Sequence, residues 1–129
     1  MTKYLYIGIG LVAIITVSFI FYKPSVGGLL SSADFIQKYK ATPNAVLIDV
    51  RTPAEFNSGH ISTAINIDYD NQSLFKEEIK KLDPAKTYFV YCRSGNRSSG
   101  AVAQMKNASI RNIYELQNGL ASAPELLNY

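Results

Sequence analysis

The alternation of apolar and polar segments along the chain predicts an α/β domain. Short apolar runs rich in β-branched or aromatic residues predict strands at 45–50, 64–67, 87–91 and 113–116. Between them, apolar residues at helical spacing predict helices near 32–39, 53–56, 74–82 and 98–107, and a last helix near 124–127. Strands that alternate with helices favour a sandwich around a mainly parallel sheet.

A separate apolar segment precedes this domain. Residues 4–22 contain no charge and no proline, and Lys3 and Lys23 flank them. As a helix, these 19 residues measure about 28 Å, close to the hydrocarbon thickness of a bilayer. We therefore expect residues 1–23 to form one apolar helix that serves as a transmembrane anchor. The alternative is a cleaved signal peptide, because small residues that suit a cleavage site follow at 26–28.

The segment at 24–30 is predicted as a flexible linker, because it contains a proline and two glycines. The folded domain is then expected at 31–129. Basic residues lie on both sides of the apolar segment and give only a weak preference for orientation. We expect the domain on the extracytoplasmic side of the membrane, on the periplasmic or outer face, or secreted if the segment is cleaved.

Composition and charge narrow the functional classes. With 47% apolar and 18% charged residues, the chain is too hydrophobic for a disordered protein. The formal net charge is +3, yet without Lys3 and Lys23 the chain has 11 basic and 10 acidic side chains. This balance argues against a nucleic-acid-binding face. One cysteine and one histidine exclude an internal disulfide and leave too few ligands for a structural zinc site.

The candidate chemistry lies in the segment 91–98, Tyr-Cys-Arg-Ser-Gly-Asn-Arg-Ser, which joins a predicted strand to a predicted helix. Ligands of open α/β sheets bind beyond the carboxyl ends of the strands, where this segment is expected. Gly95 and Asn96 tolerate positive φ angles, so successive backbone N–H groups can face inward and bind an anion. The positive end of the following helix adds to that field.

Cys92 is the candidate nucleophile of this segment. The helix end and the neighbouring Arg93 and Arg97 favour a thiolate over a thiol. The alternative is a small buried apolar residue, which free cysteines usually are.

Two separated motifs of the chain resemble the rhodanese-like sulfurtransferase family. The first is Asp-Val-Arg-Thr-Pro-Ala-Glu-Phe-Asn-Ser-Gly-His-Ile at 49–61, followed by Ala-Ile-Asn-Ile at 64–67, and the second is the cysteine segment at 91–98. The resemblance spans nearly all of 31–120 and implies a rhodanese-like three-layer sandwich. It implies that Cys92 accepts sulfur. It also implies that the loop of Arg93, Ser94, Gly95, Asn96 and Arg97 binds substrate and cradles the persulfide.

The resemblance implies a sulfurtransferase that needs neither cofactor nor metal. Cys92 would take sulfur from a small donor such as thiosulfate and pass it to a thiol or to cyanide, and a protein acceptor is not identified. One alternative is a persulfide carrier or sulfide-binding module that serves a partner protein. Another is a cysteine phosphatase or arsenate reductase, whose loop needs one more residue than the four between Cys92 and Arg97.

Residues outside the cysteine segment have structural interpretations. Asp49 is expected to accept hydrogen bonds from loop N–H groups, and Arg51 is expected to pair with Glu55. His60 is expected to fix a turn through a hydrogen bond. The chain also departs from the family, which often has glycine at the position of Thr63, proline at Asp68, and a second glycine followed by a tryptophan near Asn118 and Ala123.

Overall fold

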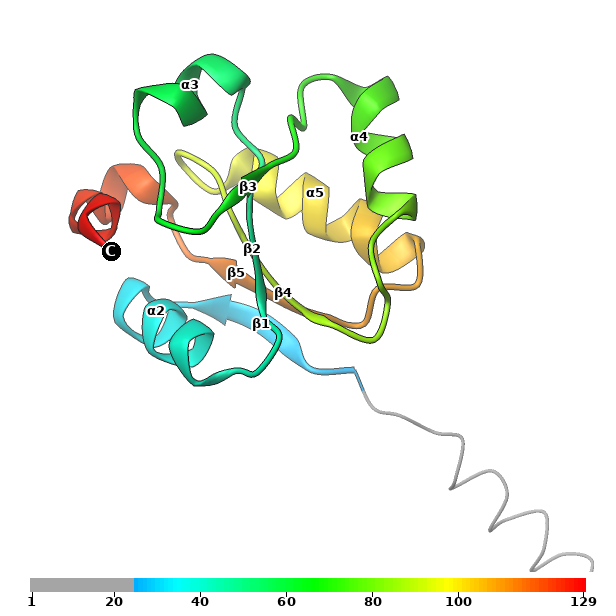
Figure 1. Ribbon diagram of the computed structural model, residues 1–129, viewed down its shortest axis with the longest axis horizontal. Helices are drawn as coiled ribbons and strands as arrows, with labels where there is room; N and C mark the ends of the chain where they lie inside the picture. The colour runs from blue at the N-terminus through cyan, green and yellow to red at the C-terminus, as the bar shows by residue number, and fades with distance from the viewer. Residues whose placement is uncertain (1–24) are drawn as a thin grey trace, which may run out of the picture.

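The computed structural model describes residues 25–129 and has a five-stranded parallel sheet at its centre (Figure 1). The strand order is β1-β5-β4-β2-β3, and all four pairings are parallel. The strands are β1 (Gly27–Leu30), β2 (Val46–Asp49), β3 (Ile65–Asn66), β4 (Thr87–Tyr91) and β5 (Asn112–Leu116). The α/β class and the parallel sheet are therefore confirmed. The predicted anchor or signal segment, 1–23, lies outside the described residues.

Helices cover both faces of the sheet (Figure 1). The helices are α2 (Ser32–Ala41), α3 (Pro53–Ser58), α4 (Gln72–Lys80) and α5 (Asn96–Asn107), followed by the 3₁₀ turns η1 (Leu120–Ser122) and η2 (Pro124–Asn128). One apolar cluster joins the sheet to α4 and α5, and a second joins it to α2 and the two 3₁₀ turns. The result is the expected three-layer sandwich, with 3₁₀ structure where a last α-helix was predicted.

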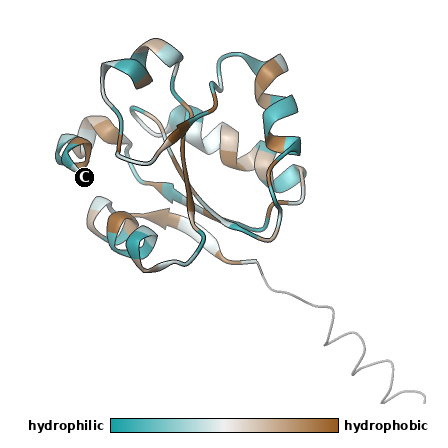
Figure 2. Ribbon diagram, in the orientation of Figure 1, coloured by the Kyte–Doolittle hydropathy of each residue, from teal (hydrophilic) through white to brown (hydrophobic). Residues whose placement is uncertain are grey.

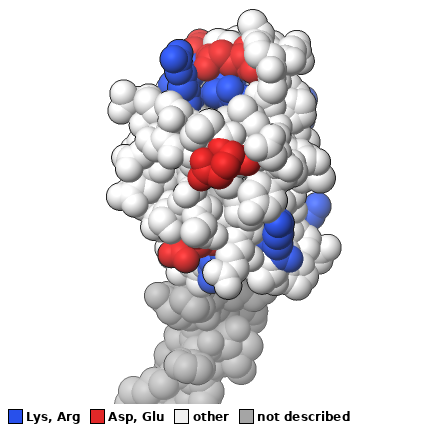
Figure 3. Space-filling view, turned by 90° about the vertical axis from the view of Figure 1, so that its left-hand side faces the viewer, with Lys and Arg blue, Asp and Glu red and all other residues white. Residues whose placement is uncertain are grey.

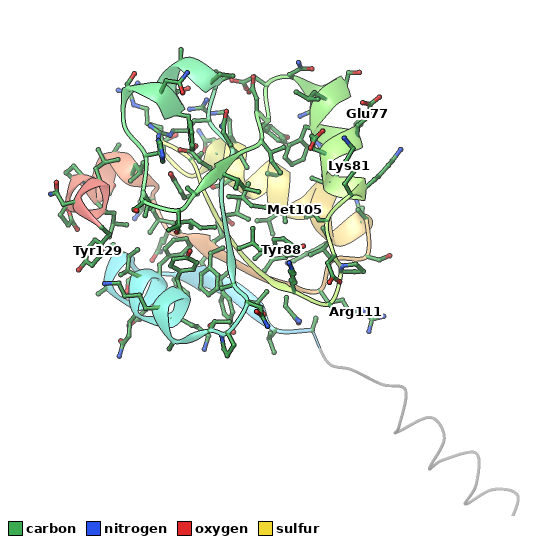
Figure 4. All side chains as sticks on the ribbon, in the orientation of Figure 1. Glu77, Lys81, Tyr88, Met105, Arg111 and Tyr129 are labelled. Carbon is green, nitrogen blue, oxygen red and sulfur yellow. The ribbon has the colours of Figure 1, made fainter. Side chains whose placement is uncertain are left out.

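The central strand β4 divides its side chains between the two clusters. Tyr88 and Val90 lie in the cluster with α4 and α5, whereas Phe89 and Tyr91 lie in the cluster with α2. Figure 4 shows Tyr88 and Met105 pointing into the space between the sheet and α5. A strand buried on both faces reads as a continuous apolar run, as the brown central strands of Figure 2 show.

The prediction of a flexible linker at 24–30 is wrong for its second half, which forms β1. The strand pairs with β5 in parallel, and its ends are fixed where Ile113 N–H donates to Val26 O at 3.0 Å and Gln117 N–H to Leu30 O at 2.9 Å. β1 is an edge strand with mostly exposed side chains, so no apolar pattern marks it. A Cβ at Gly27 would also collide with the Ile113 carbonyl. The folded domain therefore begins at Gly27.

The helices of the described region are all short. Between residues 25 and 129, none has the length and apolar character that crossing a bilayer requires.

A buried ion pair fixes the carboxyl end of β2. Asp49, which has 0% of its surface exposed, accepts hydrogen bonds from Arg51 Nε at 3.0 and 3.1 Å and from Arg51 Nη2 at 2.7 Å. Arg51 Nη2 also donates to Gly59 O at 2.7 Å. The predicted pairing of Arg51 with Glu55 is therefore wrong. Asp49, which lies two residues before Arg51, pairs with the guanidinium instead. Both side chains are buried at the end of the strand.

Removal of the Arg51 charge is expected to destabilise the fold strongly. In Arg51→Met, Asp49 stays buried without its cation, and we expect a loss of about 3–5 kcal/mol in the free energy of unfolding. Urea denaturation followed by circular dichroism measures this change. Lys81→Met is the matched control, because Lys81 pairs with Glu78 on the surface, and its midpoint should not move. A loss below about 1 kcal/mol in Arg51→Met would contradict the assignment.

Candidate active site

Cys92 follows β4 directly, at the carboxyl end of the central strand. Its side chain has 0% exposure and belongs to the apolar cluster between the sheet and α5. Burial alone fits a packing residue as well as a nucleophile. The contacts of the sulfur atom separate the two interpretations.

The sulfur of Cys92 lies against the amino-terminal end of α5. Gly95 N–H donates a hydrogen bond to Sγ at 3.0 Å, and Sγ lies 3.4 Å from Ser98 Oγ. Gly95 is the N-cap residue of α5 and has a φ of 99°, a left-handed conformation that glycine favours. The N–H groups of a helix end attract negative charge, and the sulfur lies at such an end. The sulfur therefore contacts a helix end and a buried hydroxyl in addition to its apolar surroundings.

A segment from the C-terminal part of the chain holds the cysteine loop in place. Leu120 N–H donates to Cys92 O at 2.9 Å, and Ala121 N–H donates to Arg93 O at 2.9 Å. Gly119 lies against the Arg93 carbonyl, where a Cβ would collide with it. The loop conformation therefore depends on close backbone packing by residues 119–121.

Arg97 is bound by carboxylates rather than left free for an anionic donor. Its Nη1 and Nη2 atoms donate to Glu55 Oε1 at 2.7 Å and Oε2 at 3.0 Å, and Nη1 lies 3.4 Å from Asp70 Oδ2. The hydrogen bond from Arg97 lowers the pKa of Glu55 to about 2. Figure 3 shows acidic and basic side chains side by side at the top of the face it views, the end of the molecule where α3 lies. This bidentate pair joins α3 to the start of α5.

The other predicted loop residues differ in their exposure. Arg93, Ser94 and Asn96 are exposed, and Gly95 is half-buried. Within residues 25–129, Arg93 forms no hydrogen bond or ion pair through its guanidinium. The predicted loop residues thus lie together at the end of β4, and among residues 25–129 Arg93 differs from Arg97 in having no ion-pair partner.

Two carboxylates near the site were not predicted as partners of the loop. Glu55 binds Arg97, as described above, and Glu115 on β5 accepts a hydrogen bond from Ser98 Oγ at 2.9 Å. Glu115 is buried, and burial raises its pKa although the Ser98 hydrogen bond and Lys106 lower it. A signal for Glu115 is present in the sequence, because it interrupts an apolar strand with a charge.

His60 fixes a turn, as predicted. Its Nδ1 lies 2.8 Å from Phe56 O, which accepts the hydrogen bond, and its ring stacks on the Phe56 ring with centroids 3.7 Å apart. Across the described part of the chain, no three His, Cys, Asp or Glu side chains are grouped so that they can hold a metal ion.

Comparisons with known proteins agree with this geometry. The model of the Rhodanese-like domain family matches residues 32–123. A crystal structure of a rhodanese-related protein from Thermoplasma volcanium superposes with a TM-score of 0.63 at 31% identity, over 81% of this chain and 92% of that one.

Two relatives with named activities are similar in sequence. Thiosulfate sulfurtransferase GlpE of Tolumonas auensis is 29% identical over 77 residues, which cover 60% of this chain and 70% of the relative. A tRNA uridine(34) hydroxylase of Buchnera aphidicola is 29% identical over 106 residues, which cover 78% of this chain and 33% of the relative. The chain spans a third to a half of the length of several of the curated relatives that it matches. Because the family match runs from α2 to the segment that closes the cysteine loop, the chain belongs to the Rhodanese-like domain family.

Proposed function

We propose that this protein is a sulfurtransferase that moves sulfane sulfur through a persulfide on Cys92. The contact that carries the proposal is the hydrogen bond of 3.0 Å from Gly95 N–H to the Cys92 sulfur at the start of α5. An N–H group in this position stabilises a thiolate and then a persulfide anion. Similarity to a thiosulfate sulfurtransferase supports thiosulfate, or a donor like it, as the source of sulfur.

In the first half-reaction, the Cys92 thiolate attacks the outer sulfur of thiosulfate. A bond forms between Sγ and that sulfur, and the sulfur–sulfur bond of the donor breaks, so that its electron pair leaves with sulfite. Arg93 directly follows Cys92 in the chain, is exposed, and has no ion-pair partner among the described residues. Its charge stabilises the dianionic donor and the departing sulfite.

In the second half-reaction, an acceptor removes the outer sulfur. A thiolate attacks that sulfur, the bond to Sγ breaks, and the electron pair returns to Cys92 as its thiolate. Cyanide would leave as thiocyanate by the same step. Neither a metal nor a cofactor takes part in this scheme.

The apolar segment 4–22 supports a second proposal, that the domain is tethered to a membrane. Nineteen residues without charge give an attachment by hydrophobic burial rather than by electrostatics. The domain then lies on the extracytoplasmic side, and the alternative is a secreted domain released by signal cleavage.

The nucleophile can be tested by mass and by activity. After exposure to thiosulfate, the intact protein should gain one sulfur atom, whereas Cys92→Ser should gain none and lose thiosulfate:cyanide sulfurtransfer to background. A serine hydroxyl keeps the size but cannot form a persulfide, so the fold should survive. Slow turnover with small donors beside rapid exchange with one protein would indicate a persulfide carrier. Release of phosphate from an aryl phosphate, dependent on Cys92, would indicate a phosphatase and overturn the proposal.

The role of Arg93 predicts a selective loss of donor binding. In Arg93→Ala, kcat/KM for thiosulfate should fall about tenfold, because one charge-assisted contact to the donor is removed. Steady-state kinetics measure this ratio, with Lys76→Ala as a control that removes an exposed positive charge from α4. An unchanged ratio in Arg93→Ala would remove this arginine from the donor site.

The membrane proposal predicts the behaviour of the full chain on fractionation. It should sediment with membranes and resist extraction by high salt, because hydrophobic burial is not screened by ions. Detergent should release it. Recovery of a soluble protein whose amino terminus lies between residues 25 and 30 would show that the segment is a cleaved signal instead.

A further inference from the structure

The side chain of Glu115 is buried on the same side of the sheet as Cys92. Glu115 lies on β5 beside Val90 of β4, and two residues later β4 leads into Cys92. Only 8% of its surface is exposed. A buried carboxylate is costly unless hydrogen bonds or charges compensate it, so its position requires an explanation. The sulfurtransfer scheme above leaves it without a role.

Two hydrogen bonds connect this carboxylate to the cysteine sulfur. Ser98 Oγ donates to Glu115 Oε1 at 2.9 Å, and the Cys92 thiol donates to Ser98 Oγ at 3.4 Å. Ser98 has 0% exposure, so its hydroxyl is shielded from bulk water. The three side chains form a continuous path from the sulfur to β5.

The donors in this path fix the direction in which a proton can move. A serine hydroxyl has one hydrogen, and here Glu115 takes it, although the Gly95 carbonyl lies 3.2 Å away as a second acceptor. The sulfur receives Gly95 N–H from the loop side and directs its own hydrogen to Ser98. A proton that leaves the thiol therefore has an internal acceptor two hydrogen bonds away.

We propose that Glu115 is a positioning residue that, through Ser98, takes up the proton of Cys92 when the thiolate forms. The S–H bond breaks and a new O–H bond forms at Ser98 Oγ, while the original hydroxyl hydrogen of Ser98 passes to Glu115 Oε1. One negative charge moves from the carboxylate to the sulfur, and the group keeps the same total charge. The thiolate then accepts hydrogen bonds from Gly95 N–H and Ser98 O–H. The use of this thiolate for sulfur transfer rests on the proposed function.

The charges around the path are compatible with this exchange. On α5, Lys106 favours the ionised form of Glu115, and burial acts in the opposite direction. Arg97, also on α5, is held by Glu55. The neighbouring strand β1 has no titratable side chain, and on β4 the Tyr88 hydroxyl donates to Asp83 O, away from the path. The carboxylate can thus gain a proton without losing an ion-pair partner.

The shape of a pH profile tests the proposal, because Cys92 is the only cysteine of the chain. We expect the rate of alkylation of the full chain by iodoacetamide to rise with pH in two steps, with a plateau between them. Two coupled groups that share one charge produce such a profile. In Glu115→Gln, a single step should remain, and below it the rate should fall about tenfold per pH unit.

Matched variants control for indirect effects. Glu77→Gln removes a carboxylate that projects outward from α4 (Figure 4), and it should keep both steps. Ser98→Ala interrupts the path at its centre and should give one step, like Glu115→Gln, so the test remains available if either variant folds poorly by circular dichroism. A single step in the unmodified protein, or two steps in both path variants, would overturn the proposal.

Alkylation does not depend on sulfur transfer, so the two proposals fail separately. If the profile has two steps and becomes a single step in Glu115→Gln, but no persulfide forms, only the sulfurtransferase function is contradicted. A protein that transfers sulfur with a single-step profile would contradict only the role of Glu115.

Discussion

The site depends on one constraint, the closure of the cysteine loop by the backbone of residues 119–121. Where β4 ends, the carbonyl groups of Cys92 and Arg93 have no strand partner, and the N–H groups of Leu120 and Ala121 bind them. Gly119 permits this approach because any side chain there would collide with the Arg93 carbonyl. The N–H of Gly95 can point at the sulfur only while the loop keeps this form. A segment distant in sequence therefore maintains the backbone geometry around Cys92.

The charged side chains around this loop lie at two depths, near the surface and beneath the sulfur. Toward the surface, Arg97 is bound by Glu55, and Arg93 is exposed. Beneath the sulfur lies the carboxylate of Glu115, reached through Ser98. The proposed function would use the outer cation to attract an anionic donor, and the proposed relay would use the inner carboxylate to accept a proton. The sulfur lies at the amino-terminal end of α5, where N–H groups attract negative charge.

The departures of this chain from its family are accommodated by local hydrogen bonds and backbone conformation. Thr63 stands where the resemblance leads one to expect glycine, and Asn118 lies near a second such position; both adopt positive φ angles, 71° and 62°. The hydroxyl of Thr63 lies 2.7 Å from that of Tyr39, which ties its turn to α2. Asparagine tolerates the left-handed conformation better than most residues. Both turns thus hold a non-glycine residue in a conformation that carries some strain.

The sequence by itself determined the order of helices and strands from residue 32 onward, the parallel α/β class and the position of the cysteine loop at a strand end. These features follow from hydrophobic periodicity and turn residues, which act over a few neighbouring positions. Only the tertiary structure decided that the supposed linker forms β1, since an edge strand pairs through its backbone and needs no apolar pattern. It also decided that Arg51 binds Asp49, that Glu55 binds Arg97, and that Glu115 reaches Ser98. The last two contacts join residues far apart in sequence, and all three depend on the direction in which packing turns each side chain.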